Sequence, residues 1–445
     1  MENKLVLQVD EKPGSLSTWV LLSLQHIFAA FSGIVTVPII FGSSLGFNTL
    51  EMGEIISDML IVSGVITIFQ CYGFGKFGSK LPQVMGSNFT FIGPGLAIGG
   101  AAIALNGGSP QGAYGAILGA SLIGALVQTI LGSFTDKLRE IFPPVVQGCV
   151  VSLIGMTIIG VAVDWFAGGF GAPDYGSPSN LLLGFSVLAI TIFLNQYGRG
   201  IFSSGAIFFG ILSGYIIAGI MGKLDLSPIL SAGYIHLPRP LKYGMEFKIQ
   251  YIIPFVIAYL VALVESTGDT LACGKVCGVD MEKEGERLKG ALMWGGMGSF
   301  VGALFNVTPT TTFSQNTGIV SLTGVASRWV VMGSGILLVL MGFFPKFSAL
   351  VAVMPNPVLG GAGVVMFGMI AAVGIGIFRE VDYTKGNMII VGISISAGLA
   401  VTLKPEVLSK LPEFVRTILS SGITTGTLVA VFLSMMFTKF KGGEQ

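Results

Sequence analysis

The chain has 445 residues, of which 52% are hydrophobic and only 11% carry a charge, and its mean hydropathy is +0.82. A soluble core of ordinary proportions cannot bury this much apolar surface, so the composition excludes a soluble globular protein and indicates one whose solvent is the lipid bilayer. The net charge is +1 and no block of Lys and Arg stands out, which argues against binding to nucleic acid and against an electrostatic lipid anchor.

Helices are the expected elements, because unpaired backbone groups in lipid leave only helices or closed barrels, and about 20 apolar residues in a helix cross the hydrocarbon layer. The polar start, MENKLVLQVDEKPG, lacks the layout of a cleavable secretory leader, so we expect the first span to be retained. Apolar segments predict about 14 spans. They lie at 17–42, 50–72, 82–104, 113–133, 141–163, 181–196, 202–222, 250–273, 288–305, 310–326, 328–345, 348–375, 387–403 and 418–437.

A long polar loop at 223–249 divides these spans into two sets of seven. An odd number of spans per set forces the second set to run opposite to the first. The sequence therefore predicts an inverted repeat of residues 1–222 and 250–445 around an extracytoplasmic loop. Most of the 24 Lys and Arg residues share a side with the N-terminus, so the positive-inside rule favours both termini in the cytoplasm of a protein of the cell (inner) membrane.

Two spans look interrupted. Residues 86–91 (GSNFTF) in the third span and residues 308–318 (TPTTTFSQNTG) in the tenth are poor helix formers at membrane depth. Residues 87–90 of the first repeat align with residues 311–314 of the second. We predict paired extended segments whose free backbone groups face a protein-lined cavity, which is where inverted repeats hold their substrates. The alternative is a pair of Thr/Ser-rich interfaces between helices.

The eighth span carries two acids, Glu265 and Asp269, four residues apart and therefore on one helical face. A charge at the centre of a bilayer costs about 2.5–3.5 kcal/mol, so the pair indicates a binding or proton-coupling site. Asp269 could instead be solvated near the cytoplasmic end of the span. In the first span, His26 is a candidate proton relay or a hydrogen-bonded structural group. His236, in the long loop, receives no role.

Other polar and small residues were assessed for a role in binding, packing or catalysis. The amides of Gln315 and Asn316 can donate and accept in one plane, which suits the edge of a heterocycle. The glycines at 360–363 predict helix packing, because no Lys-Ser/Thr follows them as in a phosphate loop. Four cysteines, at positions 71, 149, 273 and 277, are read as small buried apolar residues. We find no ligand set for a metal and no residues for covalent catalysis, so neither a cofactor nor an enzyme is expected.

Residues 315–324 (QNTGIVSLTG) match every fixed position of the signature of the nucleobase-ascorbate transporter family, which is Glu or Gln, Asn-x-Gly, four variable positions, and Thr followed by Arg, Lys or Gly. Three further motifs resemble that family in the same order along the chain. They are Gln25-His26, the E-x-x-G-D block at 265–269, and PNPVLGG at 355–361. The resemblance covers essentially the whole membrane portion.

This resemblance implies a core domain, from residues 15–135 and 250–345, and a gate domain, from 140–222 and 346–437, with substrate between them and a homodimer of the chain. In such proteins Glu265 would bond ring N–H groups, Gln315 would read the opposite edge, and main-chain groups at Phe89 and Ser314 would assist. The Phe89 ring would stack on the base. Further lining positions are Gly33, Gly363 and Phe367, and supporting positions are Gln25, Asn316, Gly318 and Thr323.

The resemblance also narrows the substrate. Uracil permeases of the family have Glu at the position of Gln315 and His at the position of Asp269, so both residues resemble the xanthine and urate branch. We expect import of such a purine driven by protons carried on Glu265, with Asp269 and His26. Sodium coupling and a different base, including uracil, remain open. An anion exchanger of similar repeat plan is the rival from another class, but anion sites prefer positive groups and helix N-termini.

Overall fold

The computed structural model describes residues 5–105, 108–134, 143–281 and 283–441. Within them, eight helices are long and apolar enough to cross a membrane, or up to ten if each of two bent helix pairs forms one span. The eight are α1 (Leu16–Leu45), α2 (Thr49–Tyr72), α4 (Pro110–Leu131), α6 (Pro144–Phe166), α7 (Pro178–Tyr197), α11 (Ile249–Val276), α16 (Asn356–Ile377) and α17 (Lys385–Leu403). The predicted polytopic helical fold is confirmed.

Further elements complete the described chain. The helices are α3 (Ile92–Leu105), α8 (Ile201–Ser204), α9 (Ala206–Ile220), α10 (Ser227–Ser231), α12 (Gly285–Leu304), α13 (Ser314–Thr323), α14 (Arg328–Phe343), α15 (Pro345–Ala352), α18 (Glu413–Leu419) and α19 (Gly422–Lys441). Single 3-10 turns lie at η1 (Phe89–Phe91), η2 (Phe378–Glu380) and η3 (Pro405–Leu408), and the strands are β1 (Met85–Ser87) and β2 (Thr310–Thr312).

Local sequence sets where many of these helices begin. Ser109 caps α4 and Ser177 caps α7, each by accepting a backbone N–H in the first turn, and each is followed by proline as the first helical residue. Asn48 and Glu51 form a capping box at the start of α2. Proline in the first turn loses no hydrogen bond and a polar cap satisfies an orphan N–H, so these starts are encoded within a few residues.

The two interrupted spans meet in the interior. β1 and β2 pair antiparallel, with Met85 opposite Thr312, Gly86 opposite Thr311 and Ser87 opposite Thr310. All six of these residues are buried. Backbone bonds from Asn88 to the Pro309 carbonyl and from Phe313 to the Val84 carbonyl continue the pairing at either end. The predicted extended segments are confirmed, because the strands satisfy at membrane depth the backbone groups that the broken helices release.

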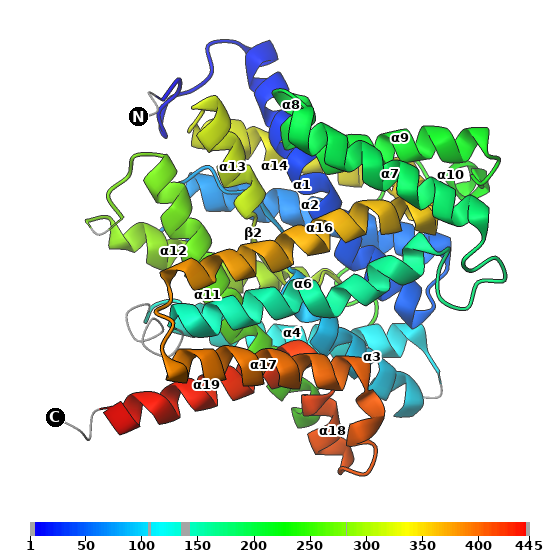
Figure 1. Cartoon of the computed structure of the whole chain (residues 1–445). Coiled ribbons are helices and arrows are strands. Elements are labelled where there is room, and N and C mark those ends of the chain that lie inside the picture. The colour runs from blue at the N-terminus through cyan, green and yellow to red at the C-terminus, as the bar shows by residue number, and fades with distance from the viewer. Residues whose placement is uncertain (1–4, 106–107, 135–142, 282, 442–445) are drawn as a thin grey trace.

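The helices pack in two sets that are visible in Figure 1. The helix α16 lies along α6 and α7, and α17 lies along α19 and α6, whereas α14 packs on α2 and α12 packs on α4. Small residues permit these close crossings, as at Gly64 against the Gly335 carbonyl and at Gly360 against the backbone of Phe166. The glycines at 360–363 thus serve in helix packing, as expected, with Gly361 against the Gly184 carbonyl.

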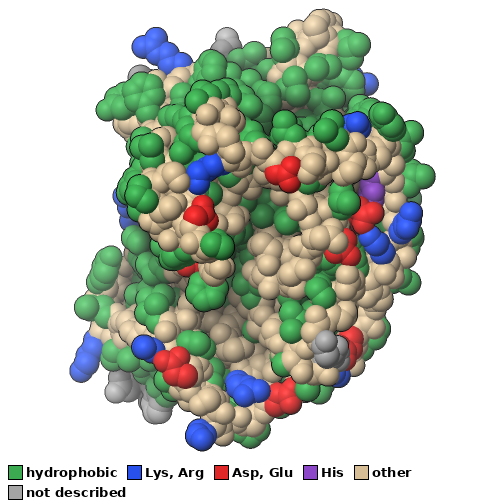
Figure 2. Space-filling view, turned by 90° about the vertical axis from the view of Figure 1, so that its right-hand side faces the viewer, with side chains coloured by type: hydrophobic (Ala, Val, Ile, Leu, Met, Phe, Trp, Pro, Cys, Tyr) green, Lys and Arg blue, Asp and Glu red, His purple; other side chains and the backbone are tan. Residues whose placement is uncertain are grey.

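The helices differ in how much of their surface the protein covers. In the most hydrophobic window of α1 and of α2, 78% of residues are buried, against 28% in α7 and 22% in α17. The last two therefore present most of their apolar residues outward. The long helices α6, α7, α16 and α17 run across Figure 1 from left to right, and both chain ends are marked on the left. Figure 2 looks onto the opposite end, where acidic and basic side chains lie among apolar ones.

Several predicted spans were wrong in their bounds. The span predicted at 348–375 begins only at Asn356, because Pro355 and Pro357 separate α16 from α15, and α15 is bent by 84° from α14. The span predicted at 418–437 begins at Gly422, after a bend of 85° between α18 and α19. The start of the fifth predicted span at 141, and the predicted domain limits at 135 and 140, lie outside the described residues.

Candidate functional site

The two acids of the E-x-x-G-D block lie on α11 beside the paired strands. The Thr90 hydroxyl, in η1, donates to Glu265 Oε2 at 3.3 Å, and the Thr312 hydroxyl, in β2, donates to Asp269 Oδ2 at 3.1 Å. Between the acids, the hydroxyls of Ser266 and Thr311 lie 3.0 Å apart. Both carboxyl groups are half-buried. One helix therefore contacts both interrupted segments through side-chain hydrogen bonds about one turn apart.

His26 and the signature motif are joined on the other side of the site. The Asn316 Nδ2 amide lies 3.1 Å from His26 Nδ1 and donates to the His26 carbonyl oxygen at 3.0 Å. His26 is 2% exposed and Asn316 is fully buried. If this amide donates to both, Nδ1 is the unprotonated nitrogen of the ring. These bonds fasten α1 to α13, and the role of His26 as a proton relay or as a structural group stays a prediction.

Gln315 is placed differently from its neighbour. Ser314 and Gln315, in the first turn of α13, are exposed, and the Gln315 side chain makes no hydrogen bond to the residues that the structure describes. One turn on, Gly318 is exposed, and a Cβ there would meet nothing within 4 Å. The same holds for Gly268 on α11, between the two acids. Because α11 and α13 pack together, accessible space borders both motif helices.

Aromatic rings lie where the two helix sets face each other. The rings of Phe89 and Phe367 meet edge to face, with centroids 5.7 Å apart, and both are buried. Gly363 precedes Phe367 by one turn of α16 and faces Ala162 of α6, with a Cβ position 3.2 Å from the alanine methyl. These residues bring α16 next to η1, one residue from Thr90.

Glycine also makes room for the ring that precedes α13. A Cβ on Gly33 would lie 3.0 Å from the Phe313 ring, and one on Gly86 would lie 2.7 Å from it. The Ser87 hydroxyl donates to the Gly33 carbonyl at 2.6 Å, so β1 is fastened to α1 at this point. Gly33 thus lies directly behind the strand pair.

The remaining predicted supporting residues are more peripheral. Gln25 is half-buried on α1. The Thr323 hydroxyl accepts from the backbone N–H of Val325 at 3.2 Å and donates to the Ile319 carbonyl at 2.8 Å, and Gly324 ends α13 in the left-handed conformation at φ 70°. The last two signature residues therefore terminate the helix that carries Gln315.

The hydroxyl partners of the acids, Thr90 and Thr312, were not among the predicted site residues, and neither was the Ser266–Thr311 pair between them. All four residues lie within segments whose polarity at membrane depth is evident in the sequence. Their partners were not evident, because the register of the strand pair decides which hydroxyl reaches which carboxyl group. Cys71, Cys149, Cys273 and Cys277 are buried and free, as expected.

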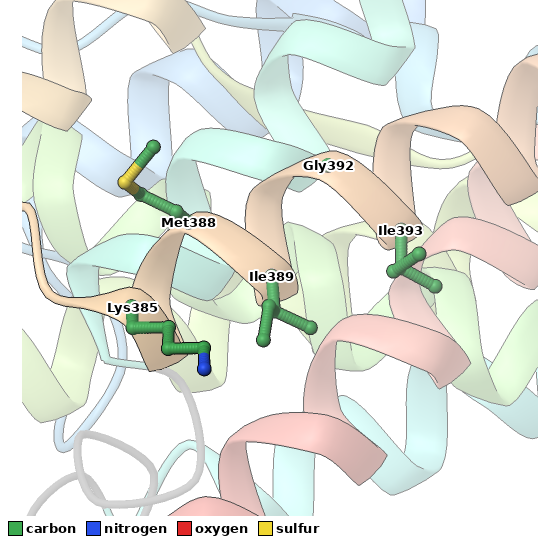
Figure 3. A pocket seen from close by; sticks show the side chains of 5 residues that line it. All are labelled: Lys385, Met388, Ile389, Gly392 and Ile393. Carbon is green, nitrogen blue, oxygen red and sulfur yellow. The ribbon is translucent and has the colours of Figure 1, made fainter.

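Two cavities lie away from the acids. One of about 550 Å³ is lined by α17 residues, Lys385, Met388, Ile389, Gly392 and Ile393, and opens on the outer face of that helix (Figure 3). The other, of about 720 Å³, lies between the loop after α10 and the first half of α2. The cavity predicted between Glu265 and Gln315 stays a prediction. Among the described residues, no group of three or more His, Cys, Asp or Glu side chains is placed to hold a metal ion.

Comparison with known proteins places the chain among transporters. The sequence model of the Permease family matches residues 17–407. The uric acid transporter of Escherichia coli K12 is 37% identical over 433 residues, covering 96% of this chain and 87% of its own length. The xanthine permease of Bacillus subtilis is 35% identical over 434 residues, covering 95% and 94%. The transmembrane domain of a cyanobacterial bicarbonate transporter shares the fold, with a TM-score of 0.60, 13% identity and coverage of 96% and 100%.

Proposed function

This chain belongs to the Permease family, within the nucleobase-ascorbate transporters, and is a transporter rather than an enzyme; we propose that it imports a purine, xanthine or urate, together with protons. The names of the uric acid transporter and of the xanthine permease support the purine class. Gln315 at the first signature position also supports a purine substrate, since a glutamine amide can both donate to and accept from a purine edge.

The observation that carries the proposal is the contact of α11 with both interrupted spans. Glu265 reaches η1 through Thr90, and Asp269 reaches β2 through Thr312, while the exposed amide of Gln315 follows β2 by three residues. A flat base bound where α11 meets the two interrupted spans would have the Glu265 carboxyl group on one side and the Gln315 amide on the other. Glu265 would accept from ring N–H groups, Gln315 would read the opposite edge, and backbone groups at Phe89 and Ser314 would add bonds.

Proton coupling follows from the chemistry of a half-buried acid. A carboxylate at membrane depth is costly, so binding of a proton and of a base that shares its hydrogen bonds would favour each other. Each proton moved down 100 mV yields about 2.3 kcal/mol, and one pH unit yields about 1.4 kcal/mol. Their sum supports roughly a 500-fold gradient of substrate, because each 1.4 kcal/mol is tenfold.

Alternating access would arise from motion of one helix set against the other. The core would hold α1–α4 and α11–α14, and the gate α6, α7, α9, α16, α17 and α19. The accessible space at Gly268 and Gly318 lies toward the end of α11 that the positive-inside rule places in the cytoplasm, which supports an inward-open arrangement. A homodimer in the cell membrane, with both termini inside, completes the proposal.

Uptake into proteoliposomes tests substrate and coupling together. Purified protein would be reconstituted and supplied with labelled xanthine, urate or uracil under an imposed pH gradient or an imposed sodium gradient. We expect purine uptake with the pH gradient alone. Sodium-driven uptake at equal pH would remove the proton assignment, and uracil uptake without purine uptake would remove the substrate assignment.

A further inference from the structure

The loop that connects the two repeats is fixed to one helix set over part of its length. In residues 236–246, the backbone N–H of His236 donates to the Phe343 carbonyl at 3.0 Å, that of Leu241 to the Leu304 carbonyl at 2.8 Å, and that of Glu246 to the Gly115 carbonyl at 3.1 Å. Their acceptors lie at the ends of α14 and α12 and on α4. The predicted outer loop is therefore built into the helix bundle at this stretch.

Two glycines of α4 leave the space that the backbone of residues 236–246 occupies. A Cβ on Gly115 would lie 2.6 Å from the Tyr243 carbonyl oxygen, and a Cβ on Gly119 would overlap the Glu246 carbonyl. The Tyr243 ring is 8% exposed and packs edge to face on Phe47 and Tyr114, with centroids 5.5 and 5.3 Å away. A pair of glycines four residues apart usually marks helix packing in membranes, but here it receives a loop.

A buried hydrogen-bonded pair completes this contact. His236 Nε2 lies 2.7 Å from Asp58 Oδ1, and Asn306 Nδ2 donates to Asp58 Oδ2 at 3.2 Å. The side chains of Asp58 and His236 are 3% and 12% exposed. Each carboxyl oxygen of Asp58 therefore has a hydrogen-bond partner from outside α2. A carboxylate inside α2 needs a compensating partner, which the loop supplies.

The stretch before His236 is held differently. It begins at Gly222, which is left-handed at φ 67°, and contains the five-residue helix α10, which packs on α15. Ser231, Ala232, Gly233 and Ile235 line the cavity of about 720 Å³ together with Glu54 and Asp58 of α2 and Ala349 of α15. Residues 236–239 and Lys242 border the same cavity, so the cavity does not distinguish the two stretches. The backbone hydrogen bonds do, because those donated from 223–235 are local, whereas three of those from 236–246 reach α4, α12 and α14.

We infer that Asp58 and His236 form a latch that fixes residues 236–246 to α2, α4 and α12, so that residues 222–235 are the flexible connection between the two helix sets. Among the charged neighbours, Lys242 pairs with Glu54, and the main-chain carbonyl of Arg239 accepts from the Asn306 amide that also donates to Asp58. The hinge role of 222–235 rests on the proposed motion of the sets, but the latch itself does not.

Hydrogen–deuterium exchange of the full chain in lipid nanodiscs tests the latch. In the wild type, amides in 236–246 should exchange at least about tenfold more slowly than those in 223–235. Asp58→Asn and His236→Gln should each raise exchange in 236–246 about tenfold, because removing one partner strands a buried group. Glu54→Gln is the matched control, since it removes the neighbouring pair with Lys242, and it should leave exchange in 236–246 unchanged.

The results that would overturn the latch can be distinguished from a failure of the proposed transport function. Equal exchange in 223–235 and 236–246 of the wild type would overturn the latch even if both variants failed to fold. Unchanged exchange in well-folded Asp58→Asn and His236→Gln would do the same. For the hinge, a linker joining cysteines from Ser231→Cys and Ala349→Cys should stop purine uptake, and full uptake by the linked protein would overturn it. If the proposed function failed, the unlinked protein would show no uptake, while the exchange pattern would stand.

Discussion

At the scale of single residues, neighbours in the signature motif have opposite environments. Gln315 is exposed at the start of α13, whereas Asn316 is fully buried and bonded to His26. The sequence places two amides side by side, and a helix turns consecutive residues about 100° apart, so only one can face the substrate. The motif therefore combines one exposed amide with one buried amide that bonds to His26.

Alanine substitution should separate these two roles. Gln315→Ala should weaken purine binding about tenfold or more without changing the Tm, because it removes a ligand contact from an exposed position. Asn316→Ala should lower stability by about 1–3 kcal/mol, because the His26 carbonyl loses its buried donor. Binding and thermal unfolding in detergent measure both. Unaltered purine affinity in Gln315→Ala would show that this amide does not touch substrate. The variant Gln315→Glu should also weaken purine binding.

Glu265 and its hydroxyl partner give a second prediction at this scale. Glu265→Gln should abolish accumulation of purine against a gradient, because an amide cannot take up the coupled proton. Thr90→Val removes the donor to Glu265 Oε2 and should reduce uptake severalfold, while Thr90→Ser should restore it. Uptake into proteoliposomes under a pH gradient measures all three. Active accumulation by Glu265→Gln at the wild-type level would contradict the coupling role.

At the scale of elements, the segment before α1 packs against α11 and α13, the helices that carry the motif residues. Leu7 pairs with Val325 in a parallel bridge, and the Ala326 and Arg328 N–H groups donate to the Leu7 and Val9 carbonyls at 2.9 Å. Val9 is 7% exposed and packs with Val320 of α13 and with Cys273 and Cys277 at the end of α11. The polar start of the sequence does not reveal this contact.

A charge introduced into this segment should lower the stability of the protein only at a buried position. Val9→Asp should lower the Tm by about 3 °C or more, because it buries a carboxylate without a partner between α11 and α13. Val6→Asp is the control, since Val6 is 69% exposed and should tolerate the charge. Thermal unfolding in detergent compares the two, and equal Tm values would remove the proposed support of the site helices by this segment.

Element types were more predictable than element limits. Apolar length located the long helices, and weak helix propensity together with the repeat alignment located the strand pair. Hydrophobicity alone continued the predicted spans through 348–355, where α15 ends and α16 begins, and through 418–421, where the chain bends. The break before α16 follows from prolines at 355 and 357. At the bend before α19, Ser421 caps the new helix by accepting the Thr424 N–H, an interaction that hydropathy does not register.

At the scale of the molecule, the Phe89 and Phe367 rings join the two helix sets beside the acids. If the sets move against each other, linking these positions should stop transport. We expect a bifunctional thiol linker between Phe89→Cys and Phe367→Cys to abolish the uptake that the unlinked double variant retains. Ser23→Cys with Ser334→Cys is the control within one set, where the Ser334 hydroxyl donates to the Ser23 carbonyl. Equal uptake by both linked proteins would argue against motion between the sets.

The sequence by itself determined the membrane class, the helical architecture, the broken spans and the acids of the site. These features follow from apolar length, from residues that form helices poorly and from the cost of charge in lipid, all of which are local properties. Only the tertiary structure decided which hydroxyl meets each acid, that His26 supports Asn316, and that His236 reaches Asp58 from 178 residues away. Those contacts depend on strand register and helix packing, which bring distant segments together without any local signal.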